Sequence, residues 1–220
     1  SGDWSSDVCS SDLHVQWNMA KAYEALGEDA LAAQQFAAMD LSDVRPALKA
    51  ELLEEHAQML RNLKDYEGTL AVYDRILSFS RHESYRALIS YRRGETAREA
   101  EREEEAIEVF QTVVETCPQT HGAYLALSSL DELEAAEVTD LERGQILYHG
   151  WQYADAAEAL RRYILSDSQE DLVTAHYYLG LAYEKLGDYS SAFEAWNMII
   201  EEHPQNEGVA DAWMAKARVE

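Results

Sequence analysis

The sequence has few of the residues that interrupt helices or cross-link chains. It contains only 3 prolines, 10 glycines and 2 cysteines among 220 residues. Proline breaks the interior of a helix and glycine weakens it, so their scarcity permits long helical segments. Alternating runs of Val, Ile and Thr, which are typical of strands, are also scarce. The composition therefore favours a helical protein.

Basic residues are also few relative to acidic ones, and long apolar runs are missing. Acidic side chains number 42 against 18 basic ones, which gives a formal net charge of -24. Such a charge repels nucleic-acid phosphates and anionic lipid surfaces. No segment approaches the roughly 18 consecutive apolar residues of a membrane-spanning helix. We therefore expect no nucleic-acid partner and no membrane span, although 47% apolar residues are enough for a folded core.

The residue patterns of metal and catalytic sites are not found. The seven histidines include no His-x-x-x-His pair, and no set of cysteines accompanies them. Cys117 stands next to Pro118 without a neighbouring His or basic residue, so we interpret it as a small packing residue. Glycine-rich phosphate loops and Gly-x-Ser-x-Gly motifs are missing too. The sequence thus predicts no metal, no cofactor and no enzyme complete within these residues.

The first 13 residues differ in composition from everything that follows. They read SGDWSSDVCSSDL and show neither a helical nor a strand period. Residues 3–13 resemble one reading frame of a common sequencing adapter, and foreign segments are left out of fold reasoning. We therefore interpret residues 1–13 as non-native, assign no role to Trp4 or Cys9, and expect the natural N-terminus to be missing.

Three columns of residues recur through the rest of the chain at a spacing near 37. The first column is small, at spacings of 37, 37, 50, 36 and 37: Ala20, Ala57, Gly94, Gly144, Gly180 and Ala217. Twelve residues after the first five of these comes a second small column: Ala32, Thr69, Ala106, Ala156 and Ala192. Four residues further on stands a bulky column: Phe36, Tyr73, Phe110, Leu160 and Trp196. This recurrence indicates a repeat protein.

Each repeat is predicted to be two antiparallel helices whose backbones approach closely at the small residues. Glycine inside a helix costs about 1 kcal/mol relative to alanine, so close packing best explains Gly94, Gly144 and Gly180, with a plain helix break as the alternative. The bulky residue is expected to fill the gap between its repeat and the next. Pro118 and Pro204 should end second helices, and Asp188 should cap one.

The unit AHYYLGLAYEKLGDYSSAFEAWNMIIEEHP, which begins at Ala175, resembles the tetratricopeptide repeat, with His176 where that family usually has Trp. The resemblance implies an all-α fold, a tetratricopeptide-type α-solenoid of antiparallel helix pairs coiled as a right-handed superhelix. We expect about five repeats, a truncated sixth after which the natural protein continues, and an extra helix. The repeats are placed at 14–45, 50–82, 87–119, 137–168, 173–206 and, in part, 208–220, and the extra helix at 123–138.

In tetratricopeptide folds the first helix of each pair lines a concave groove that binds a protein or peptide. The register places there Trp17, Lys21, Leu141, Gln145, Tyr148, Tyr177, Leu181 and Glu184. The Lys and Asn set that clamps a terminal carboxylate in chaperone-binding members is missing. This mixture favours aromatic and apolar contacts, and it is equally compatible with Tyr148 and Tyr177 packing between repeats. The resemblance implies a non-catalytic scaffold. The location stays open, and we expect it to be cytoplasmic unless the resemblance described next holds.

A second resemblance covers residues 124–218, through the segments LERGQILYHGWQYADAAEALRRYI and AHYYLGLAYEKLGDYSSAFEAW. These are similar to the helical superhelix that precedes the catalytic domain of bacterial soluble lytic transglycosylases. The catalytic Glu of that family lies in a Glu-Ser dipeptide followed by a Gly-Leu-Met-Gln type motif. Glu83-Ser84 is present here without that motif. This alternative implies a scaffold fragment with its catalytic domain beyond residue 220, a peptidoglycan partner and an extracytoplasmic, periplasmic location.

Overall fold

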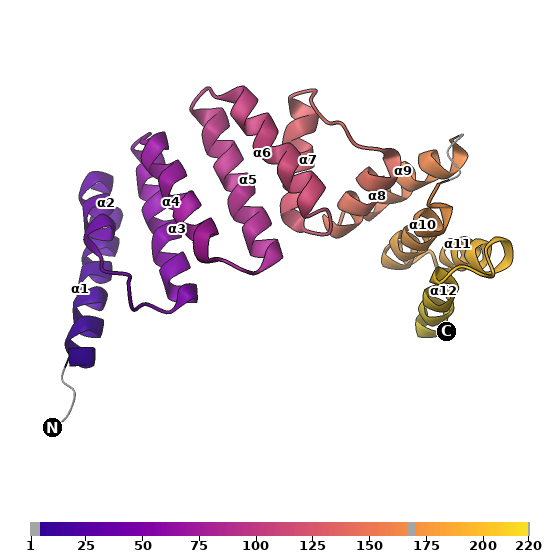
Figure 1. The fold of residues 1–220 in the computed structure, drawn as a ribbon, viewed down its shortest axis with the longest axis horizontal. Coiled ribbons are helices and arrows are strands. Elements are labelled where there is room, and N and C mark those ends of the chain that lie inside the picture. Colours follow the sequence, from indigo (N-terminus) through magenta and orange to yellow (C-terminus); the bar gives the residue numbers. More distant parts are fainter. Residues whose placement is uncertain (1–4, 167–169, 220) are drawn as a thin grey trace. The chain divides into compact units, whose positions relative to one another are not determined.

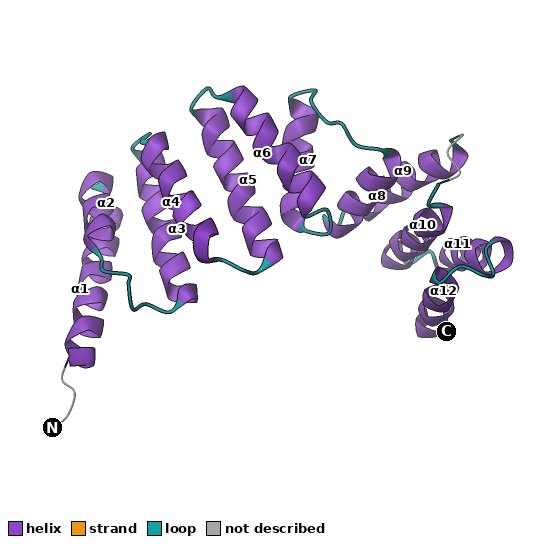
Figure 2. Ribbon diagram, in the orientation of Figure 1, coloured by secondary structure: helices purple, strands orange, loops and turns teal. Residues whose placement is uncertain are grey.

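The computed structural model describes residues 5–166 and 170–219 of the chain, and every regular element in these two ranges is an α-helix (Figure 2). Short loops connect the helices. In chain order they are α1 (Ser5–Ala25), α2 (Asp29–Ala38), α3 (Pro46–Asn62), α4 (Tyr66–Phe79), α5 (Glu83–Glu99), α6 (Glu103–Thr116), α7 (His121–Glu132), α8 (Asp140–His149), α9 (Tyr153–Leu165), α10 (Leu172–Leu186), α11 (Tyr189–Glu202) and α12 (Gly208–Val219).

The chain divides into two compact units, unit 1 (Ser1–Val109) and unit 2 (Phe110–Glu220), with the boundary inside α6. Within each unit, helices that follow one another along the chain pack side by side as antiparallel pairs (Figure 1). We call α1, α3, α5, α8 and α10 the first helices, and α2, α4, α6, α9 and α11 the second helices. No helix in the described ranges is long and apolar enough to cross a membrane.

The turn from each first helix to its second helix contains one residue in the left-handed region of backbone conformation. Glycine adopts this conformation without strain, and it is present at Gly27 (φ 74°) and Gly187 (φ 79°). The corresponding turns place there Lys64 (φ 59°), Glu101 (φ 61°) and Trp151 (φ 64°). These five positions have the same spacings as the small column, so one turn geometry recurs although only two of its residues are glycine.

The ends of several helices follow the predicted signals. The carboxylate of Asp188 accepts a hydrogen bond of 3.2 Å from the backbone N of Ser191 at the start of α11. The side chain of Asp65 does the same for Gly68 at the start of α4, at 2.9 Å. At the other end, α6 and α11 stop two residues before Pro118 and Pro204. Proline thus ends second helices where the sequence places it.

The small and bulky columns meet within one helix pair. A Cβ atom added to Gly144 on α8 would lie 2.5 Å from Cγ of Leu160 on α9. A Cβ added to Gly180 on α10 would similarly overlap the indole of Trp196 on α11, which is fully buried. The expectation that the bulky residue fills the gap between repeats is therefore incomplete. Trp196 packs first against its own pair and also belongs to a core cluster with Ala212 of α12.

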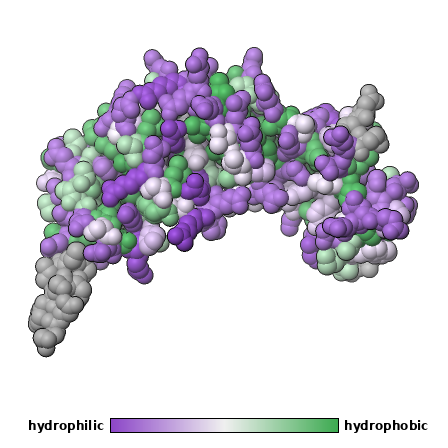
Figure 3. Space-filling model, viewed as in Figure 1, coloured by the Kyte–Doolittle hydropathy of each residue, from purple (hydrophilic) through white to green (hydrophobic). Residues whose placement is uncertain are grey.

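Apolar side chains form separate clusters along the helix array. In unit 1 one cluster joins residues of α1, α2, α3, α4 and α5, and in unit 2 two clusters join residues of α8 to α12. Hydrophilic residues cover much of the face shown in Figure 3, with smaller apolar patches between them. Each cluster thus extends between neighbouring helices, as expected for stacked pairs that share a continuous core.

Two predicted boundaries need correction. The helix expected to start at residue 14 begins at Ser5, because a helix once nucleated extends at little cost into residues of moderate propensity. The extra helix, predicted at 123–138, is α7 and runs from His121 to Glu132. Thr120 caps its start, and Glu134 takes a left-handed conformation (φ 54°) just after its end. A change of backbone conformation therefore ends α7 earlier than the apolar pattern suggests.

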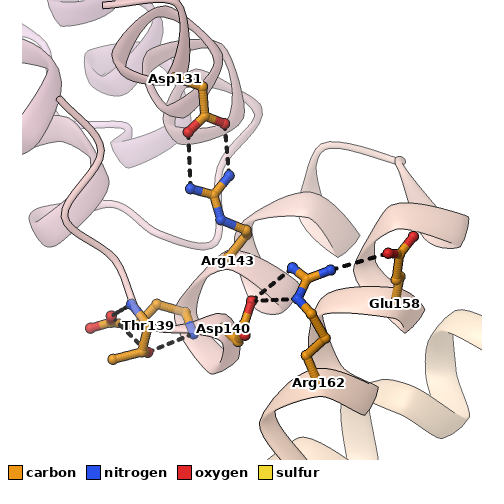
Figure 4. A network of polar contacts seen from close by, with 7 residues as sticks. Asp131, Thr139, Asp140, Arg143, Glu158 and Arg162 are labelled. Carbon is orange, nitrogen blue, oxygen red and sulfur yellow. Dashed lines mark hydrogen bonds and ion pairs between the residues drawn. The ribbon is translucent and has the colours of Figure 1, made fainter. Parts of the chain in front are cut away.

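The extra helix is joined to α8 by a polar network (Figure 4). The guanidinium of Arg143 donates two hydrogen bonds to the carboxylate of Asp131 on α7, at 2.7 and 2.9 Å. Thr139 and Glu142 form a capping box that starts α8. Arg162 of α9 donates to Asp140 at 2.7 Å, so the same network continues into the second helix of the pair.

Candidate functional site

In unit 1 the two predicted groove residues meet at a carboxylate that the prediction did not include. The indole Nε1 of Trp17 donates a hydrogen bond of 2.8 Å to Oε2 of Glu55 on α3. The ammonium of Lys21 lies 3.2 Å from the other oxygen of Glu55 and 2.7 Å from Glu24. Hydrogen bonds to Glu24 and Glu55 raise the pKa of Lys21 above its usual value of 10.5. Both residues thus connect α1 to α3.

In unit 2 two of the predicted groove residues lie in the core. Leu141 and Leu181 are each only 9% exposed and belong to separate buried clusters. Their assignment to an open groove is therefore corrected, because a leucine on a first helix also packs against the neighbouring pair. Gln145 is half-buried and lines a cavity of 390 Å³ between α6, the loop after α7, and α8.

The tyrosines of unit 2 form a packed ring cluster. Tyr148 lies edge-on to Tyr178, with ring centroids 5.5 Å apart, and Tyr177 lies edge-on to Tyr178 at 6.0 Å. His149 contributes a contact of 3.3 Å between its Nε2 and the Tyr178 hydroxyl. Burial, with smaller effects from Tyr153 and Glu184, raises the pKa of Tyr148 to about 12. These contacts favour the packing interpretation of Tyr148 and Tyr177 over a binding role.

The last predicted residue, Glu184, already has a partner. Its carboxylate accepts a hydrogen bond of 2.5 Å from the guanidinium of Arg218 on α12, and only 15% of its side chain is exposed. The hydrogen bond that Arg218 donates to Glu184 raises the pKa of Arg218. Glu184 therefore links α10 to α12.

Unit 1 contains a cavity of 1140 Å³ that we call the α3–α5 cavity. It lies between the N-terminal part of α3, the end of α4 with the loop that follows it, and the start of α5. Its apolar residues are Pro46, Ala47, Ala50 and Phe79, and its polar residues are Glu51, Glu54, Glu55, Ser78, Ser80, Arg81, His82 and Tyr85. Although polar residues are more numerous, most of the exposed surface of this lining is apolar, and clefts that combine apolar surface with polar groups are typical of ligand sites.

One wall of this cavity is a single face of α3. Its positions 47, 50, 51, 54 and 55 follow the spacing that places side chains on the same side of a helix. The opposite wall is the loop between α4 and α5, which hydrogen bonds hold in place. The guanidinium of Arg86 donates to the carbonyl oxygens of Leu77 and Ser80 at 2.6 and 2.9 Å. The Ser80 hydroxyl donates to the Ile76 carbonyl oxygen at 2.7 Å. Both walls are thus preformed.

The charged groups of the α3–α5 cavity fall into two kinds. The carboxylate of Glu54 accepts a hydrogen bond of 2.5 Å from the Tyr85 hydroxyl and pairs with Arg92. Burial and this bond to Glu54 raise the pKa of Tyr85 well above its usual value. In contrast, Glu51 and Arg81 are exposed, and neither side chain has a hydrogen bond or ion pair within the described ranges. The cavity therefore presents one carboxylate and one guanidinium that are available to a ligand.

The sequence contained a signal for part of this cavity. Adding one repeat of 37 residues to Trp17 gives Glu54, which is a lining residue. The loop residues, such as Arg81 and His82, carry no such signal because they lie between repeats. The Glu83-Ser84 dipeptide starts α5 beside this loop and does not line the cavity. The acidic Glu83 lies in the first turn of α5, where its charge favours the helix dipole.

The polar groups that line the α3–α5 cavity offer hydrogen bonds and ionic contacts to a ligand. Within the described ranges, no group of three or more His, Cys, Asp or Glu side chains could hold a metal ion. The carboxylates of Glu54 and Glu55 accept hydrogen bonds from indole, phenol and cationic groups of the chain itself. Carboxylates with such partners are held as hydrogen-bond acceptors at fixed positions.

Comparisons with known proteins found a matching family model and similar solved structures. The tetratricopeptide repeat family model matches residues 141–207. No curated protein matches the sequence. Among solved structures, MamA 41-end from Desulfovibrio magneticus RS-1 is 19% identical, with 89% of this chain and 98% of that chain covered and a TM-score of 0.40.

Two further solved structures have similar sequence identities and TM-scores. A tetratricopeptide repeat protein from Parabacteroides merdae is 16% identical, with 94% of this chain and 75% of that chain covered and a TM-score of 0.42. The TPR2AB-domain:pHSP90 complex of yeast Sti1 is 14% identical, with 95% and 83% covered and a TM-score of 0.42. In the described ranges the chain is an all-α array of antiparallel helix pairs, and residues 141–207 match the tetratricopeptide repeat family model.

Proposed function

We propose that the chain is a non-catalytic interaction module that binds an extended segment of a partner protein in the α3–α5 cavity. The observation that carries this proposal is the cavity itself, 1140 Å³ of preformed, mostly apolar space beside first helices. A preformed site lowers the cost of ordering protein groups on binding. The match of residues 141–207 to the tetratricopeptide family supports a scaffold role.

The predicted residues of unit 2 take a structural part in this proposal. Tyr148 and Tyr177 are committed to ring contacts, and Glu184 is committed to Arg218. In unit 1, Trp17 and Lys21 hold Glu55 at the edge of the cavity. These two are the predicted groove residues that we retain, as supports of the α3 wall.

A random peptide library displayed on phage, selected against the chain, tests the proposal. Ala47 is exposed inside the cavity, so Ala47→Trp fills the space without replacing a core residue. Ala71 is exposed on α4 outside it, so Ala71→Trp is the matched control. We expect selected peptides to bind Ala47→Trp at least tenfold more weakly, by fluorescence anisotropy, and Ala71→Trp unchanged. Equal binding to both variants, or a library that yields no binder, would contradict the proposal.

The alternative role, as a scaffold of a cell-wall lytic transglycosylase, stays a prediction without support from the cavity. This role, the peptidoglycan partner and the extracytoplasmic location all rest on the resemblance of residues 124–218 to that family. The interpretation of residues 3–13 as translated adapter is likewise a prediction. Recovering the intact gene outward from both ends tests both. A catalytic domain with a Glu-Ser and Gly-Leu-Met-Gln pair after residue 220 would establish the alternative.

A further inference from the structure

We propose that the occupant of the α3–α5 cavity is a lysine or arginine side chain, carried beside an apolar residue on an extended segment of a partner. This inference rests on the proposed function, because it specifies the occupant of the same cavity. The chemistry on the α3 wall supports it. All three charged side chains on that wall are carboxylates, those of Glu51, Glu54 and Glu55. Next to apolar surface, where the effective dielectric is lower than in water, a carboxylate attracts a cation more strongly.

The carboxylates that already have partners can still accept a further donor. Tyr85 bonds to Oε1 of Glu54 and Arg92 to Oε2, so each oxygen accepts one bond. Glu55 likewise receives Trp17 at Oε2 and Lys21 at Oε1. An ionised carboxylate has about four lone-pair sites, so both groups keep acceptor capacity. Their intramolecular partners therefore fix their positions without exhausting them.

Glu51 is the carboxylate to which we assign the main charge contact. It is exposed, it lines the cavity, and within the described ranges no side chain of the protein pairs with it. It lies one helical turn before Glu54 and Glu55 on the same face of α3. A basic side chain that enters the cavity along α3 thus meets a carboxylate that no internal bond competes for.

The opposite wall excludes a free cation as the best occupant. Arg81 and His82 line the cavity from the loop between α4 and α5, and Arg81 has no partner within the described ranges. A guanidinium repels a lone cation and donates hydrogen bonds to carbonyl oxygens. An extended polypeptide supplies both groups, a cationic side chain for the α3 wall and backbone carbonyls for Arg81. An acidic side chain would instead face three carboxylates.

The apolar residues fit the stem of the basic side chain. Lysine and arginine cover apolar surface with their methylene groups while the charged end stays polar. Ala47, Ala50 and Phe79 provide such a surface in the cavity. The ammonium of the protein's own Lys49 lies 5.1 Å from the centre of the Phe79 ring, a distance at which a cation is attracted to an aromatic face.

Synthetic peptides of one series test the inference. Each is a short fluorescent peptide with leucines around a central residue, which is arginine, its neutral isostere citrulline, or glutamate. Binding to the full chain is measured by anisotropy at low and at high salt. We expect arginine to bind at least tenfold more tightly than citrulline, and glutamate to bind most weakly. The preference for arginine should shrink at high salt, because added ions screen exposed charges.

Variants at Glu51 test whether this residue causes the preference for the arginine peptide. Glu51→Gln should reduce the preference for arginine several-fold, and Glu51→Lys should abolish it. Glu202→Gln is the control, because it removes the same charge from an exposed position at the end of α11. An equal effect of both Gln variants would overturn the inference, since the net charge of -24 would then explain the preference.

Two outcomes separate this inference from the proposed function. If citrulline binds as tightly as arginine while Ala47→Trp weakens both, the cavity binds peptides and the basic occupant is wrong. If every peptide binds Ala47→Trp and Ala71→Trp equally, the cavity is not the binding site and the proposed function falls with the inference. Tighter binding of the glutamate peptide would overturn the basic occupant directly.

Discussion

In unit 1, side chains on adjacent first helices meet through ionic and hydrogen bonds, whereas in unit 2 the first helices α8 and α10 meet through aromatic rings. The ion pair of Glu184 with Arg218 joins α10 to α12. Three bonds in unit 1 join residues 38 apart, one more than the repeat: Trp17 to Glu55, Glu54 to Arg92, and Arg61 to Glu99. In unit 2 the contacts between α8 and α10 come from Tyr148 and His149 to Tyr178. The same backbone repeat is therefore completed by two kinds of side-chain contact.

The difference between the units has an energetic consequence. Partly exposed ion pairs contribute about 0–1 kcal/mol, because water and salt screen them and long side chains lose freedom. Ring pairs add about 0.5–1.5 kcal/mol beyond the area they bury. We therefore expect the first-helix contacts of unit 2 to stabilise the fold more than those of unit 1. Unit 1 instead keeps polar groups available on its first helices, and there the α3–α5 cavity lies.

The largest effect should come from the ring at the centre of the unit 2 cluster. Tyr178→Ala removes the contacts with Tyr148, Tyr177 and His149 together. We expect a loss of about 2–4 kcal/mol in the free energy of unfolding, as for other large-to-small changes at packed positions. Urea unfolding measures it. Tyr189→Ala, at a tyrosine that is 52% exposed, is the control and should change stability by less than about 0.5 kcal/mol. Similar losses in both variants would remove the contrast between the units.

The small column offers a second comparison, between a glycine of unit 2 and an alanine of unit 1. Gly180→Ala in unit 2 places a methyl group against the buried indole of Trp196. Although alanine is the better helix former, overpacking should win and cost about 1–3 kcal/mol. The reciprocal change in unit 1, Ala57→Gly, removes a buried methyl group and should cost about 1–2 kcal/mol.

Thermal unfolding of both variants measures this pair of effects. A Gly180→Ala protein that is more stable than the parent would show that the indole moves aside. Close approach would then not explain the glycine. If Ala57→Gly were also neutral, close packing would not explain the small residues of the column in either unit.

These columns explain why the fold could be predicted from the sequence. Close packing restricts the residue types at Gly144, Gly180, Leu160 and Trp196, so the pattern survives as spacing. The left-handed turn was visible only at Gly27 and Gly187. Its other members, such as Trp151, are residue types that usually avoid that conformation. The ends of α7 could not be predicted because its stop is a backbone change at Glu134 and not a proline.

The candidate site was less predictable than the fold. Register alone identifies the first-helix positions, but it does not say which are covered by the next pair. Leu141 and Leu181 are covered, whereas Lys21 stays exposed. The cavity also depends on the loop around Arg81, whose position is set by hydrogen bonds from Arg86 to carbonyl oxygens nine and six residues before it. Residues outside the periodic pattern thus complete the site.

The units should also differ in their response to mild acid. Burial lowers the pKa of His149 and of His176 in unit 2 below the usual 6.5, and burial is also the largest cause that lowers the pKa of His56 in unit 1. A lowered folded-state pKa means that this stability is present above pH 6.5 and is lost as the pH falls through the folded-state value. With two such groups against one, unit 2 should lose more stability below pH 6.5.

Hydrogen exchange resolved by residue, at pH 7 and pH 5, measures this difference. His149→Gln removes one half-buried imidazole, so unit 2 of this variant should lose less protection on acidification than unit 2 of the parent. His82, exposed at the start of α5, provides the control variant His82→Gln. If unit 1 loses more protection than unit 2 on acidification, the two histidines of unit 2 do not determine the acid sensitivity of the chain.

The smallest effect is expected from the polar contacts of unit 1. Arg61 on α3 donates a hydrogen bond of 2.8 Å to Glu99 on α5, and this contact lowers the pKa of Glu99 below its usual 4.5. The contribution is therefore present above pH 4.5 and lost as the pH falls through the folded-state value. Because 39% of the Glu99 side chain is exposed, we expect Glu99→Gln to cost only about 0.5 kcal/mol at low salt and pH 7.

The salt and pH dependence of Glu99→Gln tests the comparison at its weakest contact. The cost should vanish in 1 M salt, where the screening length falls to about 3 Å, and also at pH values well below 4.5. Asp43→Asn removes one charge from an exposed loop residue without an ion pair within the described ranges, and it should be neutral under all conditions. If Glu99→Gln costs more than about 1.5 kcal/mol and the cost persists in salt, the contact is not a screened surface pair. Polar contacts would then hold unit 1 together as firmly as rings hold unit 2, and the cavity would owe its preformed walls to them.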